Sequence, residues 1–368
     1  MLNGYRILIK AVQVVIFVIA VASAGCSAMG GSQGKSETAP EASGGPDRAA
    51  LRAQAKAIFG TLPSDAADPA RPISTAQVDL GRTLYYDPRL SKNHDISCNS
   101  CHQLDAFGAD GEPTSPGHKG QRGDRNSPTT LNAALHIAQF WDGRAPDVEE
   151  QAKGPVLNPV EMAMPSEEAV VVVLDSIPGY GPLFHEAFPE DPAPISYDNM
   201  GIAIGAFERG LITPAPLDAF IAGDDSALTA EQAAGLETFI AVGCVACHNG
   251  AAVGGGAYRK LGLVNPYPTE DRGREKVTGQ PEDLYVFKVP SLRNVTETGP
   301  WFHDGSIGQI DEAVTLMAHH QIGVTLTPEQ TRSIVAFLGA LTGQVSPKYV
   351  ARPTLPPDGP DTPKPDPT

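Results

Sequence analysis

The sequence predicts a mainly α-helical chain, rich in loops, made of two similar domains. Three capping boxes mark helix starts, because a Ser or Thr and a Gln three residues later satisfy each other's backbone N–H groups. They are Ser74 with Gln77, Thr229 with Gln232, and Thr327 with Gln330. The 38 glycines and 34 prolines indicate many loops. A Cys-x-x-Cys-His motif occurs twice, 146 residues apart, which indicates a repeated unit.

Further helices follow from local signals. Pro328 suits the first position of the helix that starts after Thr327, and Gly343 is the expected end of that run. Ser166 and two acidic residues precede the valines at 170–173, which favours a helix over a strand. Another helix is expected over 199–211, and we find no series of hairpins.

The chain divides at changes in composition. Residues 26–50 are rich in Gly, Ser, Ala and Glu and read as a flexible linker, while 347–368 are dominated by Pro and Asp and read as a disordered tail. Pro214, Pro216 and the Gly-Asp-Asp at 223–225 suggest the domain boundary. The predicted domains are therefore 51–223 and 224–346.

The N-terminus reads as an export signal. Residues 1–25 have a short basic start, with Arg6 and Lys10, and an apolar stretch over 11–24 that suits a signal peptide better than a membrane span. Two processing routes compete: cleavage at the small residues 22–24, or lipid attachment at Cys26, whose preceding residues resemble a lipobox without its usual Leu. We favour the lipid anchor slightly, and expect a periplasmic protein either way.

The charge balance limits the partners. A formal net charge of −16 argues against nucleic acid. It is compatible with docking of a basic protein, although many exported proteins are acidic without any such partner.

The two Cys-x-x-Cys-His motifs predict two covalently bound haems. Two thiols at this spacing can add to the two vinyl groups of one haem, and the adjacent His reaches the iron as proximal ligand. A zinc half-site or a redox dithiol is the alternative, but no further cysteine pair would complete a zinc site. The residues are Cys98, Cys101 and His102, then Cys244, Cys247 and His248. We therefore expect two cytochrome c-like helical domains.

The sixth position on each iron decides between electron transfer and binding of peroxide or oxygen. Met317 is the candidate for the second haem, but a Met at helical spacing is as often core packing. For the first haem the candidates are His94, His118 and His136. His118 lies in a Gly-rich loop, which would allow reversible binding, although loop histidines are more often simply solvated.

At this point the sequence resembles the bacterial dihaem cytochrome c peroxidase family over residues 80–346. The stretches that carry the resemblance occur in order along the chain: 80–91, 125–129, 139–144, 149–152, 158–162, 287–294 and 302–306. So many ordered matches exceed the coincidence of a single short motif.

The resemblance implies roles for the iron ligands. The haem of Cys98, Cys101 and His102 would be the low-potential peroxidatic centre, with His118 in its distal position in the inactive oxidised form. The second haem would be the high-potential centre, with His248 and Met317 as its two ligands.

The resemblance also implies further site residues. Glu161 matches the distal acid–base glutamate, Trp141 the tryptophan between the haems, and Gln151 and Phe140 other residues that shape the peroxide pocket. A calcium site between the domains would use the Asn126 side chain and the carbonyls of Thr298 and Pro300. Hard oxygen ligands suit calcium.

The expected function is reduction of hydrogen peroxide to water with electrons from a small c-type cytochrome or a cupredoxin, in a homodimer. One rival is a dihaem maturation oxidase that acts on a protein substrate; those relatives have Tyr where Met317 stands. The other rival is a dihaem electron carrier without catalysis, which has no use for a distal acid such as Glu161.

Overall fold

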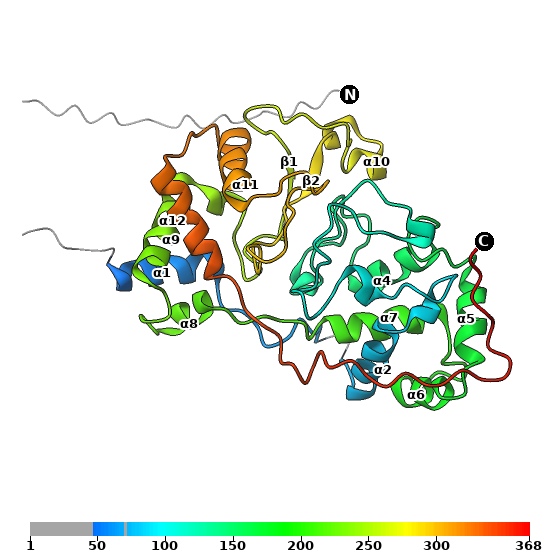
Figure 1. The fold of residues 1–368 in the computed structure, drawn as a ribbon. Coiled ribbons are helices and arrows are strands. Elements are labelled where there is room, and N and C mark those ends of the chain that lie inside the picture. The colour runs from blue at the N-terminus through cyan, green and yellow to red at the C-terminus, as the bar shows by residue number, and fades with distance from the viewer. Residues whose placement is uncertain (1–46, 70–71) are drawn as a thin grey trace, which may run out of the picture. The chain divides into compact units, whose positions relative to one another are not determined.

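The computed structural model describes residues 47–69 and 72–368, and the expected signal peptide, Cys26 and almost all of the predicted linker lie outside them. The described part is mostly helical, with short one-turn 3-10 segments between the main elements. The α-helices are α1 (Arg48–Phe59), α2 (Thr75–Tyr85), α3 (Cys98–Cys101), α4 (Val148–Leu157), α5 (Glu167–Asp175), α6 (Tyr180–Ala187), α7 (Tyr197–Glu208), α8 (Pro216–Ala222), α9 (Ala230–Val242), α10 (Glu275–Thr278), α11 (Ile310–Met317) and α12 (Pro328–Gly339) (Figure 1).

The sheet content of the described residues is one antiparallel pair. Strand β1 (Tyr258–Lys260) pairs with β2 (Val286–Lys288), with Arg259 opposite Phe287. Two strands of three residues cannot form a core by themselves. This agrees with the absence of a hairpin series in the sequence.

The helix starts predicted from capping residues are confirmed. All three capping boxes form at α2, α9 and α12, with both reciprocal hydrogen bonds in each. The valines at 170–173 lie in α5, whose N-cap Ser166 accepts a hydrogen bond from the Ala169 N–H. The last helix ends at Gly339, earlier than expected, because Gly343 serves another purpose: its N–H donates to Asn294 Oδ1 at 2.9 Å.

A hydrophobic core in the first half of the chain forms where α2 crosses α7. The two helices approach so closely that a Cβ on Gly81 would overlap the carbonyl oxygen of Ala203. Tyr85 and Phe207, both fully buried, pack edge to face at the end of this crossing. Helices α5 and α6 complete this core.

The second half repeats the arrangement. Helix α9 crosses α12, and a Cβ on Gly235 would overlap the carbonyl oxygen of Ser333. Figure 1 shows the two crossed pairs, α2 with α7 and α9 with α12, in separate parts of the described residues. The second core is distinct from the first in its residues, although both lie within one compact unit. The repeat of secondary structure follows the repeat of the Cys-x-x-Cys-His motif.

The first helix corrects a predicted boundary. The sequence placed residues from 51 onward in the N-terminal domain, but Leu51, Ala55 and Phe59 of α1 are buried in the second core. The Phe59 ring lies 6.5 Å from that of Phe337 on α12. The apolar face of α1 therefore finds its partner far along the chain, which composition alone does not reveal.

The prediction of a disordered tail over 347–368 is also wrong for the structure described here. Residues of this segment follow the first half, as the red chain beside α6 and α5 in Figure 1 shows. The Tyr86 hydroxyl donates to the carbonyl of Val350 at 2.7 Å, and Arg89 binds the Pro356 carbonyl at 2.8 Å and the Asp358 carboxylate at 2.7 Å. An extended Pro-rich chain leaves its carbonyls free, and these side chains bind them.

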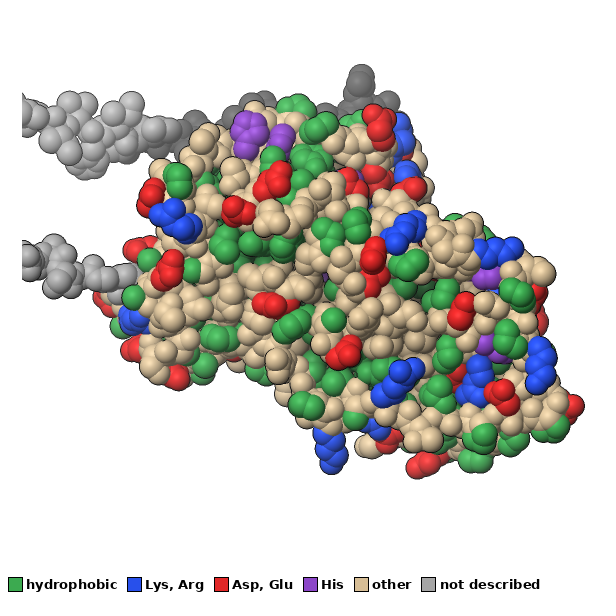
Figure 2. All heavy atoms as spheres, in the orientation of Figure 1, with side chains coloured by type: hydrophobic (Ala, Val, Ile, Leu, Met, Phe, Trp, Pro, Cys, Tyr) green, Lys and Arg blue, Asp and Glu red, His purple; other side chains and the backbone are tan. Residues whose placement is uncertain are grey.

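The surface is mixed in charge. Acidic and basic side chains are interspersed over the face in Figure 2. In residues 47–69 and 72–368, no helix is long and apolar enough to cross a membrane.

Candidate active site

The first Cys-x-x-Cys-His motif forms a short helix of its own. Cys98 and Cys101 open and close α3, so that their side chains, three residues apart, lie on one side of the turn. The His102 N–H donates to the Cys98 carbonyl at 3.0 Å, which fixes the histidine directly after the turn. Both thiols are half-buried and neither is in a disulfide. They are therefore free to be alkylated by a cofactor.

These three side chains line a cavity with an empty volume of about 1220 Å³. Its wall also contains the sequence-predicted residues Phe140, Trp141, Gln151, Glu161 and Asn126. The structure thus brings together, around one cavity, residues spread from 98 to 161.

His102 is suited to bind a metal. Burial lowers its pKa, against the opposing effect of the Gly108 and Pro128 carbonyls. A lowered pKa keeps the imidazole neutral, as a metal ligand must be. The two free thiols and the neutral imidazole, gathered at one cavity, fit a covalently bound haem.

His118 lies beside Glu161. Its N–H donates to the carbonyl of Glu161 at 2.7 Å, and a Cβ on the preceding Gly117 would overlap the carbonyl oxygen of Val160. The side chain is 6% exposed, and its Nε2 has no hydrogen-bond partner among the residues that the structure describes. A buried imidazole nitrogen without a partner is a costly arrangement unless something binds it. Ligation of iron by His118 stays a prediction.

The other two histidine candidates are engaged elsewhere. His136 Nδ1 lies 3.1 Å from the Nζ of the buried Lys288. His94 is half-buried near Arg89 and Asp358, at the tail. Neither is among the residues that line the cavity.

Glu161 has an environment that tunes its acidity. Burial raises its pKa, while Arg144 and a 2.8 Å hydrogen bond from Asn158 Nδ2 oppose that rise. A second pocket, of about 620 Å³, shares Glu161, Arg144 and Phe140 with the haem cavity. Because Arg144 is exposed, we place this second pocket on the path between solvent and Glu161.

Arg144 is a site residue that the sequence analysis did not single out. Its guanidinium lies 3.4 Å from the centre of the Phe140 ring and donates to both oxygens of Asp142, at 3.1 and 3.2 Å. The cation–π contact and the ion pair hold it over the cavity. Arg144 lies in the 139–144 stretch, so the motif was visible, but nothing in the sequence says that this arginine reaches Glu161.

Trp141 joins the two halves. Its Nε1 donates to the carbonyl of Asn126 at 2.9 Å, and its own carbonyl accepts from the Lys288 N–H of β2 at 2.8 Å. The indole also lines the cavity. It therefore lies at the edge of the first cavity that borders the second half.

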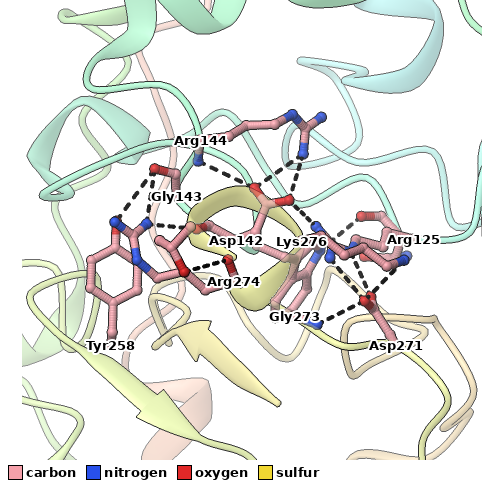
Figure 3. Close-up of polar contacts among 12 residues, drawn as sticks. Arg125, Asp142, Gly143, Arg144, Tyr258, Asp271, Gly273, Arg274 and Lys276 are labelled. Atoms are coloured by element: carbon pink, nitrogen blue, oxygen red, sulfur yellow. Dashed lines mark hydrogen bonds and ion pairs between the residues drawn. The ribbon is translucent and has the colours of Figure 1, made fainter. Parts of the chain in front are cut away.

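A polar network next to Trp141 strengthens this junction (Figure 3). Arg125 binds the Asp142 carboxylate at 2.6 Å and both oxygens of Asp271, at 2.6 and 3.0 Å. Arg274 donates to the Asp142 carbonyl at 2.9 Å. Although burial opposes it, hydrogen bonding to Arg125 holds the pKa of Asp271 below its ordinary value. The network thus fastens 125–144 to 271–274 with charged groups.

The second motif follows the end of α9. Gly243 ends that helix with φ of 100°, a conformation that favours glycine, and Cys244 starts the next turn at once. Burial lowers the pKa of His248 to about 4, against the carbonyls of Val253 and Pro290. Met317 is the last residue of α11 and half-buried. Its ligation of the second iron stays a prediction.

The expected calcium ligands are placed as follows. Asn126 is 9% exposed, and its Nδ2 lies 3.1 and 3.3 Å from the carbonyls of Glu112 and Pro113. Thr298 and Pro300 lie just before Trp301, whose Nε1 donates to the Val295 carbonyl. In the part of the chain that the structure describes, no three or more acidic, histidine or cysteine side chains gather as a metal site. The calcium site stays a prediction.

Comparisons with known proteins identify the family of the chain. The di-haem cytochrome c peroxidase family model matches residues 75–226. The chain is 46% identical over 323 residues to cytochrome c551 peroxidase of Pseudomonas aeruginosa, covering 86% of this chain and 92% of that protein. It is 33% identical over 301 residues to methylamine utilization protein MauG of Methylorubrum extorquens, covering 78% and 83%.

The solved structures give the same fold. A MauG-like protein associated with microbial copper homeostasis superposes with a TM-score of 0.71 at 26% identity, covering 79% of this chain and 97% of that one. The predicted helical, cytochrome c-like fold and the haem c cofactors are thereby confirmed. This chain belongs to the di-haem cytochrome c peroxidase family.

Proposed function

We propose that the protein reduces hydrogen peroxide to water at the first haem, with electrons that enter through the second. One observation carries this: Glu161 lines the same cavity as Cys98, Cys101 and His102. The cavity therefore combines the attachment site of a redox cofactor with a titratable acid. The relatives named as cytochrome peroxidases support the same activity.

The haem supplies the redox chemistry of O–O bond cleavage. The protein supplies protons and position. Peroxide reduction consumes two electrons and two protons and yields two waters. Ionised Glu161 accepts a proton from one peroxide oxygen and returns it to the other, so that the second oxygen leaves as water. Asn158 donates a hydrogen bond of 2.8 Å to the carboxylate, and the nearby Arg144 opposes the rise in the pKa of Glu161 that burial causes.

Access and electron entry follow from the surrounding residues. Peroxide enters through the pocket that Glu161 and Arg144 share with the cavity. A small c-type cytochrome or a cupredoxin would deliver electrons to the second haem. Cys244, Cys247 and His248 would hold this haem, and Met317 would be the other ligand of its iron. Trp141 lies on the route toward the first haem. Gln151 and Phe140 restrict the space around the substrate.

His118 acts as the switch. His118 would hold the first iron in the oxidised protein and would leave it once the second haem is reduced. The backbone N–H of His118 donates a hydrogen bond to the carbonyl of Glu161. The position of the His118 loop therefore depends on the segment that carries Glu161. The proposal has three further parts. Asn126, Thr298 and Pro300 would bind calcium between the halves. The protein would be a homodimer, and it would lie in the periplasm, attached through Cys26.

The rivals differ in what they require. A maturation oxidase acts on a protein substrate, and the 33% identical MauG keeps it as the second candidate. Met317, in the place where such oxidases have Tyr, favours the peroxidase. An electron carrier would leave Glu161 without a role.

The test is peroxide turnover by the holoprotein with reduced cytochrome c, before and after reduction of the second haem alone. The wild type should turn over only after this half-reduction. Glu161→Gln should lose turnover by about 10²–10⁴-fold, since acid–base catalysis is worth that much, and the exposed Glu190→Gln should behave as wild type. Turnover without half-reduction would refute the switch. Unimpaired turnover in Glu161→Gln would refute the role of this residue.

A further inference from the structure

Glu208 is a second acid in the wall of the first cavity, and the mechanism above does not use it. It is the last residue of α7, 3% exposed, and lines the cavity together with Cys98 and His102. Among residues 47–69 and 72–368, no hydrogen bond or ion pair reaches its carboxyl oxygens. Burial makes the ionised form of such a carboxyl costly, so its place in the cavity wall calls for an explanation.

The charges around Glu208 disfavour its ionised form. Arg209, the next residue, is bound by Glu149 through two hydrogen bonds of 2.7 and 2.9 Å. The remaining groups that face it are Tyr85 on α2 and Cys98 on α3, neither of which is a cation. Burial and then Glu149 raise the pKa of Glu208 to about 8, with Arg209 opposing.

The second half shows what the fold needs at this position. The crossing contact of Gly81 with Ala203 corresponds to that of Gly235 with Ser333. In this register Phe207 corresponds to Phe337, both fully buried. The residue after each is Glu208 in the first half and Leu338 in the second. Both are 3% exposed.

A leucine therefore satisfies the packing at the end of the crossed helices. The acid in the first half is not required by the architecture, and it gives up the apolar burial that Leu338 contributes in its own half. A destabilising polar group kept at the edge of a reaction cavity indicates a chemical role.

We propose that Glu208 takes up one proton from solvent when an electron reaches the haem held by Cys98, Cys101 and His102, and releases it when that electron leaves. The carboxylate becomes a carboxylic acid, no other bond changes, and the electron comes from the donor. An added negative charge in a medium of low dielectric strengthens proton binding by a nearby carboxylate. The inference relies on the proposed function only for the arrival of electrons at this haem.

The test is the midpoint potential of each haem, measured by spectroelectrochemistry on the holoprotein between about pH 6 and pH 10, a range that brackets the raised Glu208 pKa. In the wild type, the potential of the first haem should fall as pH rises. Its slope should approach about 59 mV per tenfold change in proton concentration, the value for one proton per electron. The midpoint potential of the second haem should not show this dependence on pH.

Two variants and a control separate the outcomes. Glu208→Gln keeps the shape, and Glu208→Leu copies Leu338; both should flatten the slope of the first haem. Glu186→Gln removes an exposed carboxyl from α6 of the same half and should leave the slope unchanged. An equal slope in wild type and both variants would overturn the inference. If Glu208→Leu fails to incorporate haem, Glu208→Gln decides. Peroxide is absent throughout, so failure of the peroxidase proposal cannot be mistaken for failure of this one.

Discussion

The two halves of this protein use one scaffold for two different sites. Each has crossed helices at a buried glycine, a Cys-x-x-Cys-His turn, and an asparagine with φ near 60°, Asn132 or Asn294. The side chains of both asparagines donate to the same hydroxyl, Thr213 Oγ1, at 2.7 and 3.0 Å. The halves are thus built alike down to single hydrogen bonds.

They also meet through equivalent segments. The Asn126 N–H donates to the His303 carbonyl, and the Lys288 N–H donates to the Trp141 carbonyl, both at 2.8 Å. Asn126 and Lys288 each stand two residues before a proline, while Trp141 and His303 each follow a phenylalanine of positive φ. The junction is therefore self-complementary, like that of a two-fold dimer.

The difference lies in what fills the shared positions. The first half has Trp141 where the second has His303, and Glu208 where the second has Leu338. The first half also has the cavity with Glu161 and Arg144. One helix crossing can therefore carry two different sets of side chains, apolar at Leu338 and acidic at Glu208.

The largest effect should come from the glycines of the crossings. A Cβ at Gly81 or Gly235 overlaps a backbone carbonyl, so each alanine variant should lose about 3 kcal/mol of unfolding free energy. Chemical denaturation with haem absorbance as the readout measures this. Gly181→Ala, on α6 with open space around it, should be close to neutral. A large loss of unfolding free energy in only one of the two alanine variants would show that the two helix crossings are not equivalent.

A smaller effect concerns acidity in the first half alone. Glu161 must be ionised to accept a proton, so activity should fall as pH decreases through its pKa. Burial raises that pKa and Arg144 lowers it. Arg144→Gln should therefore move the acid limb of kcat/KM to higher pH, as measured in peroxide turnover. The exposed Arg332→Gln in the second half should leave the profile in place. An acid limb shifted to lower pH would contradict the assigned effect of Arg144.

The smallest effect concerns the tail. Asp358→Ala removes the ion pair with Arg89, in which the aspartate side chain is 57% exposed. Such a pair contributes about 0.2–1 kcal/mol, so the loss of unfolding free energy should be of that size. The stabilisation by this ion pair in the wild type should itself disappear as pH falls, because pairing with Arg89 lowers the pKa of Asp358 and protonation of the carboxylate ends the pairing. Asp361→Ala is the matched control, and an equal loss there would exclude a specific role for the ion pair.

The sequence predicted what is encoded locally. Capping boxes need only four consecutive residues, and the Cys-x-x-Cys-His turn needs five, so helix starts and haem attachment were both found. The resemblance to a family supplied Glu161, Trp141, Gln151 and Phe140, and the structure gathers these around one cavity.

What was missed depends on contacts between distant residues. Arg89 and Pro356 are 267 residues apart, so a Pro-rich tail read alone looks disordered. The place of α1 in the second core has the same cause. Glu208 is one of 43 acidic residues, and only the crossing of α2 and α7 reveals that it is buried at the cavity.

The paths of α1 and the tail have a practical consequence for dissecting this protein. From α1 onward, the described chain runs from the second core to the first, returns to the second, and then follows the first half as far as residue 368. No single cut yields two complete pieces. A fragment that stops at residue 223 would keep α1 but lose α12, whose Phe337 ring lies against Phe59, and it would lack the tail segment that binds Arg89. In studies of haem loading or folding, isolated halves would expose apolar surfaces that are buried in the whole protein. Such experiments should therefore use the whole chain.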